Sequence, residues 1–273
     1  MMPPAMIFFL ILSSPRSGST LLAQCLSSHS QVIIPNETDW IVPAAFVLDR
    51  VRDESAGRRL IAEIITRSQG FATNLGEYLL PAEVEHLIER SSYSLLAMAE
   101  SLYGRIAEKV GKRLAGDKSP NDLMSLRHLF LHGLLTSKVI HLVRDGRDVC
   151  ASLMRMKWVE GVENYFARQW NANNLYLSHL MRGAANYHFL RYEDFAAAPK
   201  STLEKVCAFL GIRFEEQMLD TAGFHPRYRH RLPHEHLYRP IEPHSGEHCE
   251  HKGLVPLWES QAREALEFFG YLP

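Results

Sequence analysis

A short polar loop near the start of the chain carries the first residues that could do chemistry. Residues 6–12 form an apolar, β-favouring run, residues 13–20 are Ser-Ser-Pro-Arg-Ser-Gly-Ser-Thr, and a helix-compatible segment continues to Leu26. A strand, a tight loop and a helix in this order direct backbone N–H groups and the positive end of a helix dipole at one anion. We therefore expect this loop to bind a phosphate or sulfate group in a nucleotide-dependent enzyme.

The loop differs from the Walker A motif GxxxxGK[ST], because it has no Lys before its final hydroxyl residues. Its only cation is Arg16, while Gly18 permits close backbone approach and Ser17, Ser19 and Thr20 add hydroxyl groups. The alternative is an ordinary turn in which a Ser or Thr caps the following helix. Capping alone requires neither an Arg nor a Gly, so the anion-binding interpretation is favoured.

A second motif covers residues 138–154, where a β-favouring run ends at Arg144 and Ser152 follows eight residues later. If a helix begins near Gly146, Asp148 and Ser152 lie four residues apart on one helix face. An Arg fork and a Ser hydroxyl together suit a terminal phosphate. The alternative is that the charged run Arg-Asp-Gly-Arg-Asp pairs with itself on a solvated surface.

The two motifs resemble those of the sulfotransferases that use 3′-phosphoadenosine 5′-phosphosulfate (PAPS). In that family, a segment similar to residues 15–22 binds the 5′-phosphosulfate, and an Arg followed eight residues later by a Ser binds the 3′-phosphate. The resemblance extends from about Ile7 to Tyr271 and is weakest in residues 40–111. It implies donor contacts from Arg16, Ser17, Gly18, Ser19, Thr20, Leu21, Arg144 and Ser152.

Three further segments are similar to family motifs. Residues 190–195, Leu-Arg-Tyr-Glu-Asp-Phe, resemble the segment whose Tyr contacts adenine, which implies that role for Tyr192. Residues 116–120, Gly-Asp-Lys-Ser-Pro, resemble the segment whose Lys lies near the transferred sulfuryl group, which implies a catalytic role for Lys118. His251, Lys252 and Gly253 resemble the Arg-Lys-Gly segment that binds the 3′-phosphate, with His in place of Arg.

The residue that removes the acceptor proton differs between branches of the family. Cytosolic small-molecule members usually have a Lys where this chain has Arg16 and a His base where it has Pro120. The chain is more similar to the bacterial and tyrosyl-protein branches, which use a Glu shortly after the second strand, and Glu37 stands at that position. The alternative for Glu37 is a helix-capping or surface carboxylate.

The resemblance implies an in-line displacement with a loose transition state, by analogy with phosphoryl transfer. Glu37 would accept the proton of an acceptor hydroxyl, and Lys118, Arg16 and the loop N–H groups would stabilise charge on the departing oxygen. PAPS is the expected co-substrate and adenosine 3′,5′-bisphosphate the expected product. We expect no metal, because a sulfuryl group carries less charge than a phosphoryl group. The acceptor is a small-molecule or carrier-bound hydroxyl whose identity the sequence leaves open.

Five short apolar runs, each followed by a helical pattern, are the elements that must position these residues. They cover residues 6–12, 32–34, 113–116, 138–143 and 187–190. Alternation of this kind predicts an α/β fold with a central parallel sheet between two helical layers, a P-loop-like nucleotide-binding fold whose ligands lie beyond the carboxyl ends of the strands. We expect one domain over residues 1–273, with a helical insertion at 40–111 covering the acceptor side and an irregular His- and Arg-rich loop at 224–256.

Charge, apolar stretches and cysteine spacing indicate which kinds of ligand and cellular location to expect. The formal net charge is −1, which gives no indication of nucleic-acid binding. No apolar stretch approaches the roughly 20 residues that span a bilayer, so we expect no membrane span and a cytoplasmic protein. Four scattered cysteines without a CxxC pair indicate reduced thiols. The spacing of His244, His248, Cys249 and His251 would suit zinc, but without a second cluster an anion-contacting loop is favoured.

Two other functions remain open from the sequence. A P-loop kinase could use Asp145 as a metal-binding Walker B residue, although the chain has no Walker Lys and a kinase does not need the pair Arg144 and Ser152. A non-catalytic nucleotide-binding protein is the other alternative. Nucleotide binding alone would not require Glu37 and Lys118, so a transferase is favoured over both.

Overall fold

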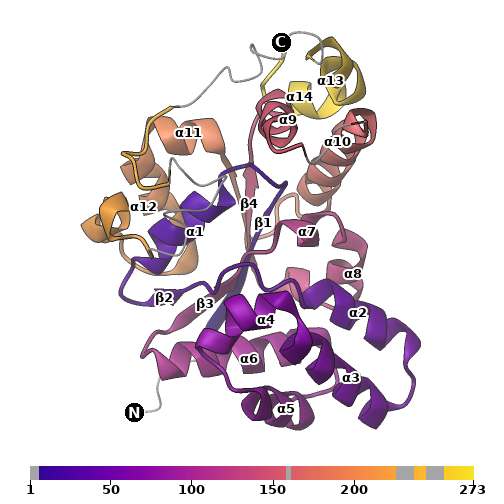
Figure 1. The fold of residues 1–273 in the computed structure, drawn as a ribbon. Helices are drawn as coiled ribbons and strands as arrows, with labels where there is room; N and C mark the ends of the chain where they lie inside the picture. The colour runs from indigo at the N-terminus through magenta and orange to yellow at the C-terminus, as the bar shows by residue number, and fades with distance from the viewer. Residues whose placement is uncertain (1–5, 158–160, 226–236, 244–254) are drawn as a thin grey trace. The chain divides into compact units, whose positions relative to one another are not determined.

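The computed structural model describes residues 6–157, 161–225, 237–243 and 255–273. Five strands form one sheet in the order β2-β3-β1-β4-β5, with helices flanking it (Figure 1). The strands are β1 (Ile7–Ser13), β2 (Val32–Ile33), β3 (Leu114–Asp117), β4 (Lys138–Val143) and β5 (Tyr187–Arg191). The predicted α/β class with a central parallel sheet is confirmed, and each of the five predicted runs corresponds to one strand.

The strands are continuous apolar runs because a parallel sheet is covered on both faces. In β1 every residue after Ile7 is buried, and all four residues of β3 are buried. β3 pairs in parallel with both β1 and β2, in a register that sets Leu10 opposite Asp117 and Ile33 opposite Ala115. The last residue of β3 is therefore polar and buried, at the carboxyl end of the strand.

The chain divides into two compact units, of which the first comprises Met1–Leu12 and Leu26–Val139. In it, α6 packs against β2 and β3, and α3 packs against both α2 and α5. Its helices are α2 (Ile41–Arg50), α3 (Glu54–Arg67), α4 (Gln69–Thr73), α5 (Pro81–Arg90), α6 (Leu95–Lys109), α7 (Pro120–Leu123) and α8 (Leu126–Leu131), with 3₁₀ turns at Leu75–Glu77 and Leu134–Thr136. Residues 40–111 thus contain helices and no strand, as the sequence predicts.

The second unit comprises Ser13–Cys25 and Ile140–Pro273. Here α10 packs against α9, α13 and α14, and α11 packs against α12 and β5. The helices are α9 (Gly146–Arg155), α10 (Glu163–Leu180), α11 (Tyr192–Ala197), α12 (Pro199–Leu210), α13 (Val255–Gln261) and α14 (Arg263–Phe268), with 3₁₀ turns at Glu216–Leu219 and Thr221–Gly223. α1 (Ser19–Ser27) begins in this unit and ends in the first.

Local capping explains where several helices begin and end. Asp53 accepts a hydrogen bond from the Ala56 N–H at the start of α3, and Ser94 accepts one from the Ala97 N–H at the start of α6. α12 ends at Gly211, whose φ of 82° lies in the left-handed region that favours glycine.

The residue pattern at 257–269 predicts a single closing helix, and this prediction is wrong. The structure has two short helices, α13 and α14, separated at Ala262, whose φ of −121° and ψ of 15° leave the helical region. The break lets both helices pack against α10. Trp258 of α13 and Phe269, which follows α14, each lie near the Trp170 ring, with centroids 6.4 and 6.3 Å away. Burial of these large rings outweighs the local preference for one continuous helix.

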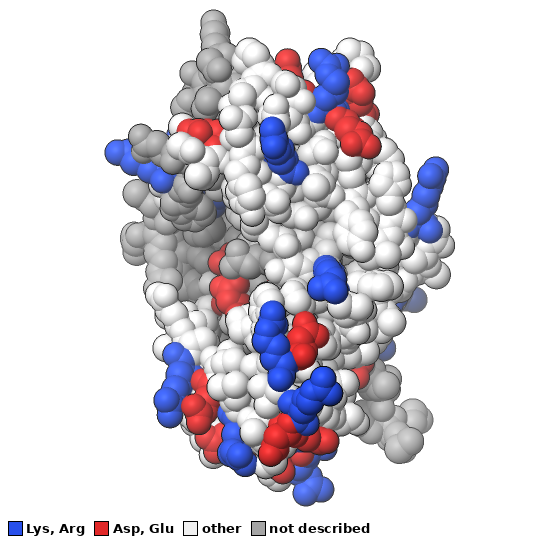
Figure 2. Space-filling view, turned by 90° about the vertical axis from the view of Figure 1, so that its right-hand side faces the viewer, with Lys and Arg blue, Asp and Glu red and all other residues white. Residues whose placement is uncertain are grey.

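Cys25, Cys150 and Cys207 are free and buried, and burial raises the pKa of Cys150 to about 12. Cys249 lies outside the described residues. On the face drawn in Figure 2, the coloured Lys and Arg side chains lie among Asp and Glu side chains and form no extended patch of one sign. Within the described part of the chain, every helix is too short or too polar to cross a bilayer.

We predict that Gly146→Ala destabilises the second unit. A Cβ at this position would lie 2.9 to 3.1 Å from three atoms of the buried Trp170 ring. Overpacking of this kind costs about 1–3 kcal/mol of unfolding free energy, measurable by urea denaturation. Gly104→Ala in α6 is the matched control, since its Cβ would meet only the flexible end of Met6 at 3.2 Å. Equal stabilities for the two variants would contradict the packing argument.

Candidate functional site

The loop after β1 has an unusual backbone conformation. Arg16 and Gly18 have φ values of 68° and 90°, both in the left-handed region. The Ser17 N–H donates to the Ser14 carbonyl at 3.3 Å, and Ser17 is fully buried. Ser19, Thr20 and Leu21 form the first turn of α1, where N–H groups have no partner within the helix. The residues predicted to bind an anion therefore form a tight turn at a helix N-terminus, which suits that role.

Gly18 lies directly against the ring of Tyr192. A Cβ on Gly18 would lie 2.5 and 2.6 Å from two ring atoms of Tyr192, so a larger residue does not fit. Arg144 covers the same ring, with its guanidinium carbon 4.8 Å from the ring centroid. Arg144 Nη1 also donates to the Arg16 carbonyl at 3.2 Å. The second unit thus brings together the predicted loop, Arg144 and Tyr192 from three separate parts of the sequence.

Ser152 joins this group through Arg16. Arg16 Nε donates to Ser152 Oγ at 3.0 Å. Asp148 and Ser152 lie one turn apart in α9 and are both buried, as the predicted helix requires. Arg144 and Ser152, predicted as a pair, therefore both contact Arg16, one at its carbonyl and the other at its guanidinium. The arrangement supplies two guanidinium groups and one hydroxyl beside the loop, a donor set that suits a phosphate.

The remaining charges of this motif hold α9 in place. Asp145 caps the helix by accepting a 2.9 Å hydrogen bond from the Arg147 N–H, and it also pairs with the Arg147 guanidinium at 2.7 Å. The Arg147 guanidinium also donates to Glu259 Oε1 at 2.9 Å and to the Tyr271 carbonyl oxygen at 3.0 Å. The alternative that the charged run of residues 144–148 pairs with itself therefore applies to Asp145 and Arg147. Arg144 instead contacts the loop after β1. Asp145 has a structural role here, which weakens its assignment as a Walker B residue.

A buried polar chain supports the loop and was not predicted from the sequence. Asn174 Nδ2 donates to Ser14 Oγ at 3.2 Å, and Asn174 Oδ1 lies 3.0 Å from His141 Nε2. His141 Nδ1 lies 2.8 Å from the Tyr187 hydroxyl. Burial lowers the pKa of His141 to about 4. A neutral His141 that donates to Asn174 and accepts from Tyr187 satisfies all three side chains.

In the first unit, Lys118 and Glu37 form an ion pair. Lys118 follows β3 and is 1% exposed, and its Nζ donates to Glu37 Oε1 at 2.8 Å. The Glu37 side chain is 40% exposed. Asn74 Nδ2 donates to the Glu37 carbonyl at 2.5 Å, which fixes the backbone at this position. Two of the three residues predicted to be catalytic, Glu37 and Lys118, are therefore in direct contact, with the carboxylate open to solvent and the amine buried.

Beside this ion pair lies a buried network centred on Asp117. Thr38 donates to Asp117 Oδ1 at 2.7 Å, and the Tyr103 hydroxyl donates to the same oxygen. Burial, together with the neighbouring Asp117 carboxylate, holds the pKa of Asp122 well above its usual range. A protonated Asp122 that donates to Asp117 accounts for both carboxyl groups. The network fixes the residues on either side of the pair, since Thr38 follows Glu37 and Asp117 precedes Lys118.

His251, Lys252 and Gly253 lie outside the described residues, as does most of the predicted His- and Arg-rich loop. The remaining predicted site residues fall into two groups, each described within its own unit. The loop with Arg144, Ser152 and Tyr192 belongs to the second unit, and Glu37 with Lys118 belongs to the first.

Comparison with known proteins identifies the family. Residues 9–216 match the model of the sulfotransferase family. Sulfotransferase 2A6 of Mus musculus is 32% identical over 139 residues, which are 45% of this chain and 47% of the mouse protein. The match thus spans about half the length of this curated relative.

Two solved structures share the fold. The sulfotransferase domain of the Synechococcus PCC 7002 olefin synthase aligns over 100% of this chain and 99% of its own, with a TM-score of 0.63 and 22% identity. The mouse sulfotransferase SULT7A1, solved in complex with PAP, aligns over 98% of this chain and 89% of its own, with a TM-score of 0.52 and 13% identity. At these identities the two structures establish the fold alone.

We predict that His141 makes the protein less stable in mild acid. Because the pKa of His141 is about 4 in the fold and near 6.5 when unfolded, the unfolded chain binds more protons between these values. Stability from this group is complete above pH 6.5 and is lost as the pH falls toward 4, by about 3 kcal/mol. Urea denaturation at several pH values in this range gives the unfolding free energy as a function of pH. The slope of that dependence should be smaller for His141→Gln than for the unmodified protein.

The exposed His86→Gln is the control for this experiment, and it should keep the slope of the unmodified protein. If His141→Gln also keeps that slope, the neutral buried histidine is not supported.

Proposed function

Because the chain belongs to the sulfotransferase family, we propose that it transfers a sulfuryl group from PAPS to an acceptor hydroxyl. The observation that carries this proposal is the group formed by Arg16, Gly18, Arg144, Ser152 and Tyr192. Two guanidinium groups, a hydroxyl and an aromatic ring meet at one helix N-terminus. Such a set matches a ligand with two anionic groups and a flat base.

The donor would divide its groups among these residues. The loop N–H groups and Arg16 would bind the 5′-phosphosulfate, since a helix N-terminus favours an anion. Arg144 and Ser152 would bind the 3′-phosphate, and Tyr192 would contact adenine. We assign a further 3′-phosphate contact to His251, Lys252 and Gly253 on the resemblance alone.

Glu37 and Lys118 would carry the transfer itself. Glu37 would accept the proton as the acceptor O–H bond breaks and its oxygen bonds to sulfur. The bond between sulfur and the bridging oxygen breaks, and its electron pair stays with adenosine 3′,5′-bisphosphate. Lys118 and Arg16 would stabilise the charge on that oxygen. The 2.8 Å contact between Lys118 and Glu37 supports this division, because it holds the acid–base group and the cation together.

The reaction as proposed uses no metal, since the cations of the site are side chains. The acceptor would be a hydroxyl of a small molecule or of a carrier-bound chain. The neighbour from an olefin synthase supports keeping the second class in the proposal. Asp145 offers little support for the kinase alternative, because its carboxylate pairs with Arg147 at 2.7 Å.

We predict that the protein binds adenosine 3′,5′-bisphosphate without Mg²⁺ and that Arg144→Ala weakens this binding about 10- to 100-fold. The range reflects about 1.5–3 kcal/mol for a hydrogen bond to a charged group. Calorimetry with the bisphosphate and with Mg·ATP measures both preferences. Arg168→Ala is the control, since this exposed Arg donates only to Gln261 among its described hydrogen bonds. A preference for Mg·ATP, or equal binding by Arg144→Ala and Arg168→Ala, would refute the donor assignment.

We predict that Glu37→Gln lowers turnover by about 10²- to 10⁴-fold and leaves bisphosphate affinity nearly unchanged. The amide oxygen can still accept from Lys118, but the side chain no longer takes a proton. Turnover is measured as bisphosphate release from PAPS with an acceptor found by screening. Glu85→Gln, an exposed carboxylate of α5, is the control. Full turnover in Glu37→Gln would show that another group is the base.

A further inference from the structure

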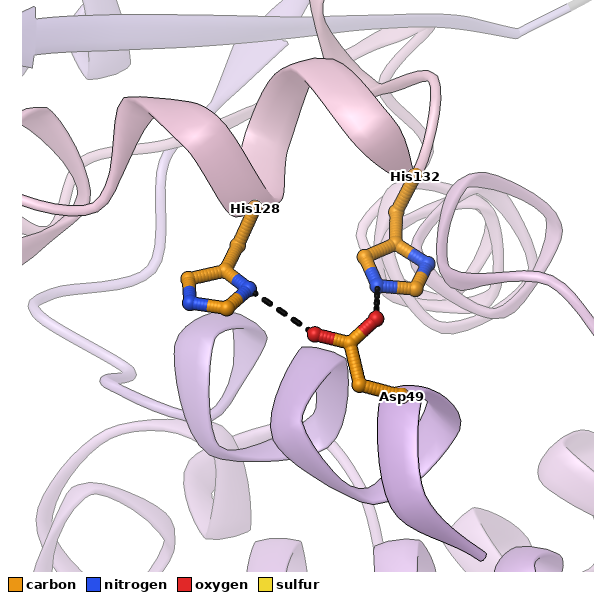
Figure 3. A group of neighbouring side chains, drawn as sticks. All are labelled: Asp49, His128 and His132. Carbon is orange, nitrogen blue, oxygen red and sulfur yellow. Dashed lines mark hydrogen bonds and ion pairs between the residues drawn. The ribbon is translucent and has the colours of Figure 1, made fainter. Parts of the chain in front are cut away.

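A second group of polar side chains lies in the first unit, apart from the residues discussed above. Asp49 of α2 faces His128 and His132, which α8 and the residue after it provide (Figure 3). Asp49 Oδ2 lies 3.1 Å from His128 Nδ1, and Asp49 Oδ1 lies 3.0 Å from His132 Nε2. One ligand atom from each residue lies within 4.8 Å of the other two.

Local structure holds the three side chains in this arrangement. The His132 N–H donates to the His128 carbonyl at 3.0 Å, so the two histidines lie one helical turn apart on the same face. α2 packs against α8, which sets Asp49 opposite that face. The Phe46 ring, one turn before Asp49 in α2, packs against the His128 ring, with the two ring centroids 4.4 Å apart. This contact limits the rotation of the His128 side chain.

We propose that Asp49, His128 and His132 bind a zinc-class divalent metal ion. Two imidazole nitrogens and one carboxylate oxygen are a donor set that suits Zn²⁺, Co²⁺ or Ni²⁺, whereas Mg²⁺ and Ca²⁺ prefer oxygen ligands alone. The ion would replace the protons that now link Asp49 to the two rings, because a ligating histidine must present a lone pair. The fourth position would be taken by water.

Access to the site agrees with this assignment. The side chains of His128 and His132 are 15% and 16% exposed, and that of Asp49 is 32% exposed. The two ring nitrogens come from α8 and its C-terminal end and the carboxylate from the facing helix α2, and each side chain is partly exposed, so an ion can reach them from solvent. An Asp that only joined two helices by hydrogen bonds would need one histidine, whereas here both carboxylate oxygens face a ring nitrogen.

The bound ion would act as a structural link. α2 begins four residues after Glu37, and α8 begins eight residues after Lys118. Tying α2 to α8 would therefore restrain the two segments that carry this ion pair. Metal binding does not depend on the proposed transfer reaction, because none of the three ligands belongs to the donor-binding or catalytic residues.

The proposal is tested by equilibrium dialysis of the full chain against ZnCl₂ and by visible absorption with CoCl₂. His132→Gln is the central variant, because its amide can still donate to Asp49 but does not provide an imidazole ligand. His132→Gln and Asp49→Asn should each bind one metal equivalent fewer than the unmodified protein. Their affinity at this site should fall at least about 100-fold, since loss of an outer-shell partner alone costs about 10- to 100-fold.

His86→Gln, an exposed histidine of α5, is the matched control and should keep the full stoichiometry. Zinc at about 100 times its Kd should raise the Tm of the unmodified protein and of His86→Gln by roughly 5 °C, and should raise that of His132→Gln much less. Comparing variants separates this site from the other histidines of the chain. Equal stoichiometry and affinity in His132→Gln and His86→Gln would overturn the proposal, as would a failure of the unmodified protein to bind.

Discussion

The contact between Gly18 and the Tyr192 ring is the constraint on which the second unit depends. Because Gly18 has no side chain, the ring reaches the loop backbone, and Arg144 then covers the ring while donating to the Arg16 carbonyl. Arg16 in turn donates to Ser152. These contacts share Tyr192, Arg144 and Arg16, so the close approach that Gly18 permits brings two guanidinium groups and a hydroxyl together beside the loop.

A buried chain of uncharged polar side chains also supports the loop after β1. The chain from Ser14 through Asn174 and His141 to Tyr187 is buried, and burial keeps His141 unprotonated by lowering its pKa to about 4. That these supporting side chains are uncharged has an electrostatic consequence for the loop. A charged histidine near the loop would need a counterion, whereas an uncharged one leaves the positive potential of the loop to Arg16 and Arg144.

In the first unit, a buried lysine amine lies beside a carboxylate that solvent can reach. Lys118 and Glu37 lie next to Asp117 and Thr38 in the chain, and these two residues share a buried hydrogen bond of 2.7 Å. The Tyr103 hydroxyl donates to Asp117 as well, and burial beside this carboxylate raises the pKa of Asp122 well above its usual range. Hydrogen bonds from Thr38 and Tyr103 to Asp117 offset part of the cost of burying these polar groups and fix the backbone from which the ion pair projects.

The sequence by itself determined the five strands and the tight loop that we expect to bind an anion. The predicted run over residues 138–143 is β4, while Pro81 begins α5 and Gly211 follows the end of α12, because apolar periodicity, proline and glycine act over a few residues. The family resemblance predicted catalytic roles for Glu37 and Lys118, and the structure brings the two side chains into contact.

Only the tertiary structure decided which side chains meet over long separations. Ser152 bonds Arg16, 136 residues away, and Asp49 faces His128 and His132 from 79 and 83 residues away. The His-x₃-His spacing was visible in the sequence, but the aspartate that makes it a candidate metal site comes from the packing of α2 against α8. The break at Ala262 has the same origin, since burial of Trp258 and Phe269 against Trp170 depends on a helix nearly a hundred residues earlier. Local patterns specify elements, whereas packing between distant elements selects the partners of polar side chains.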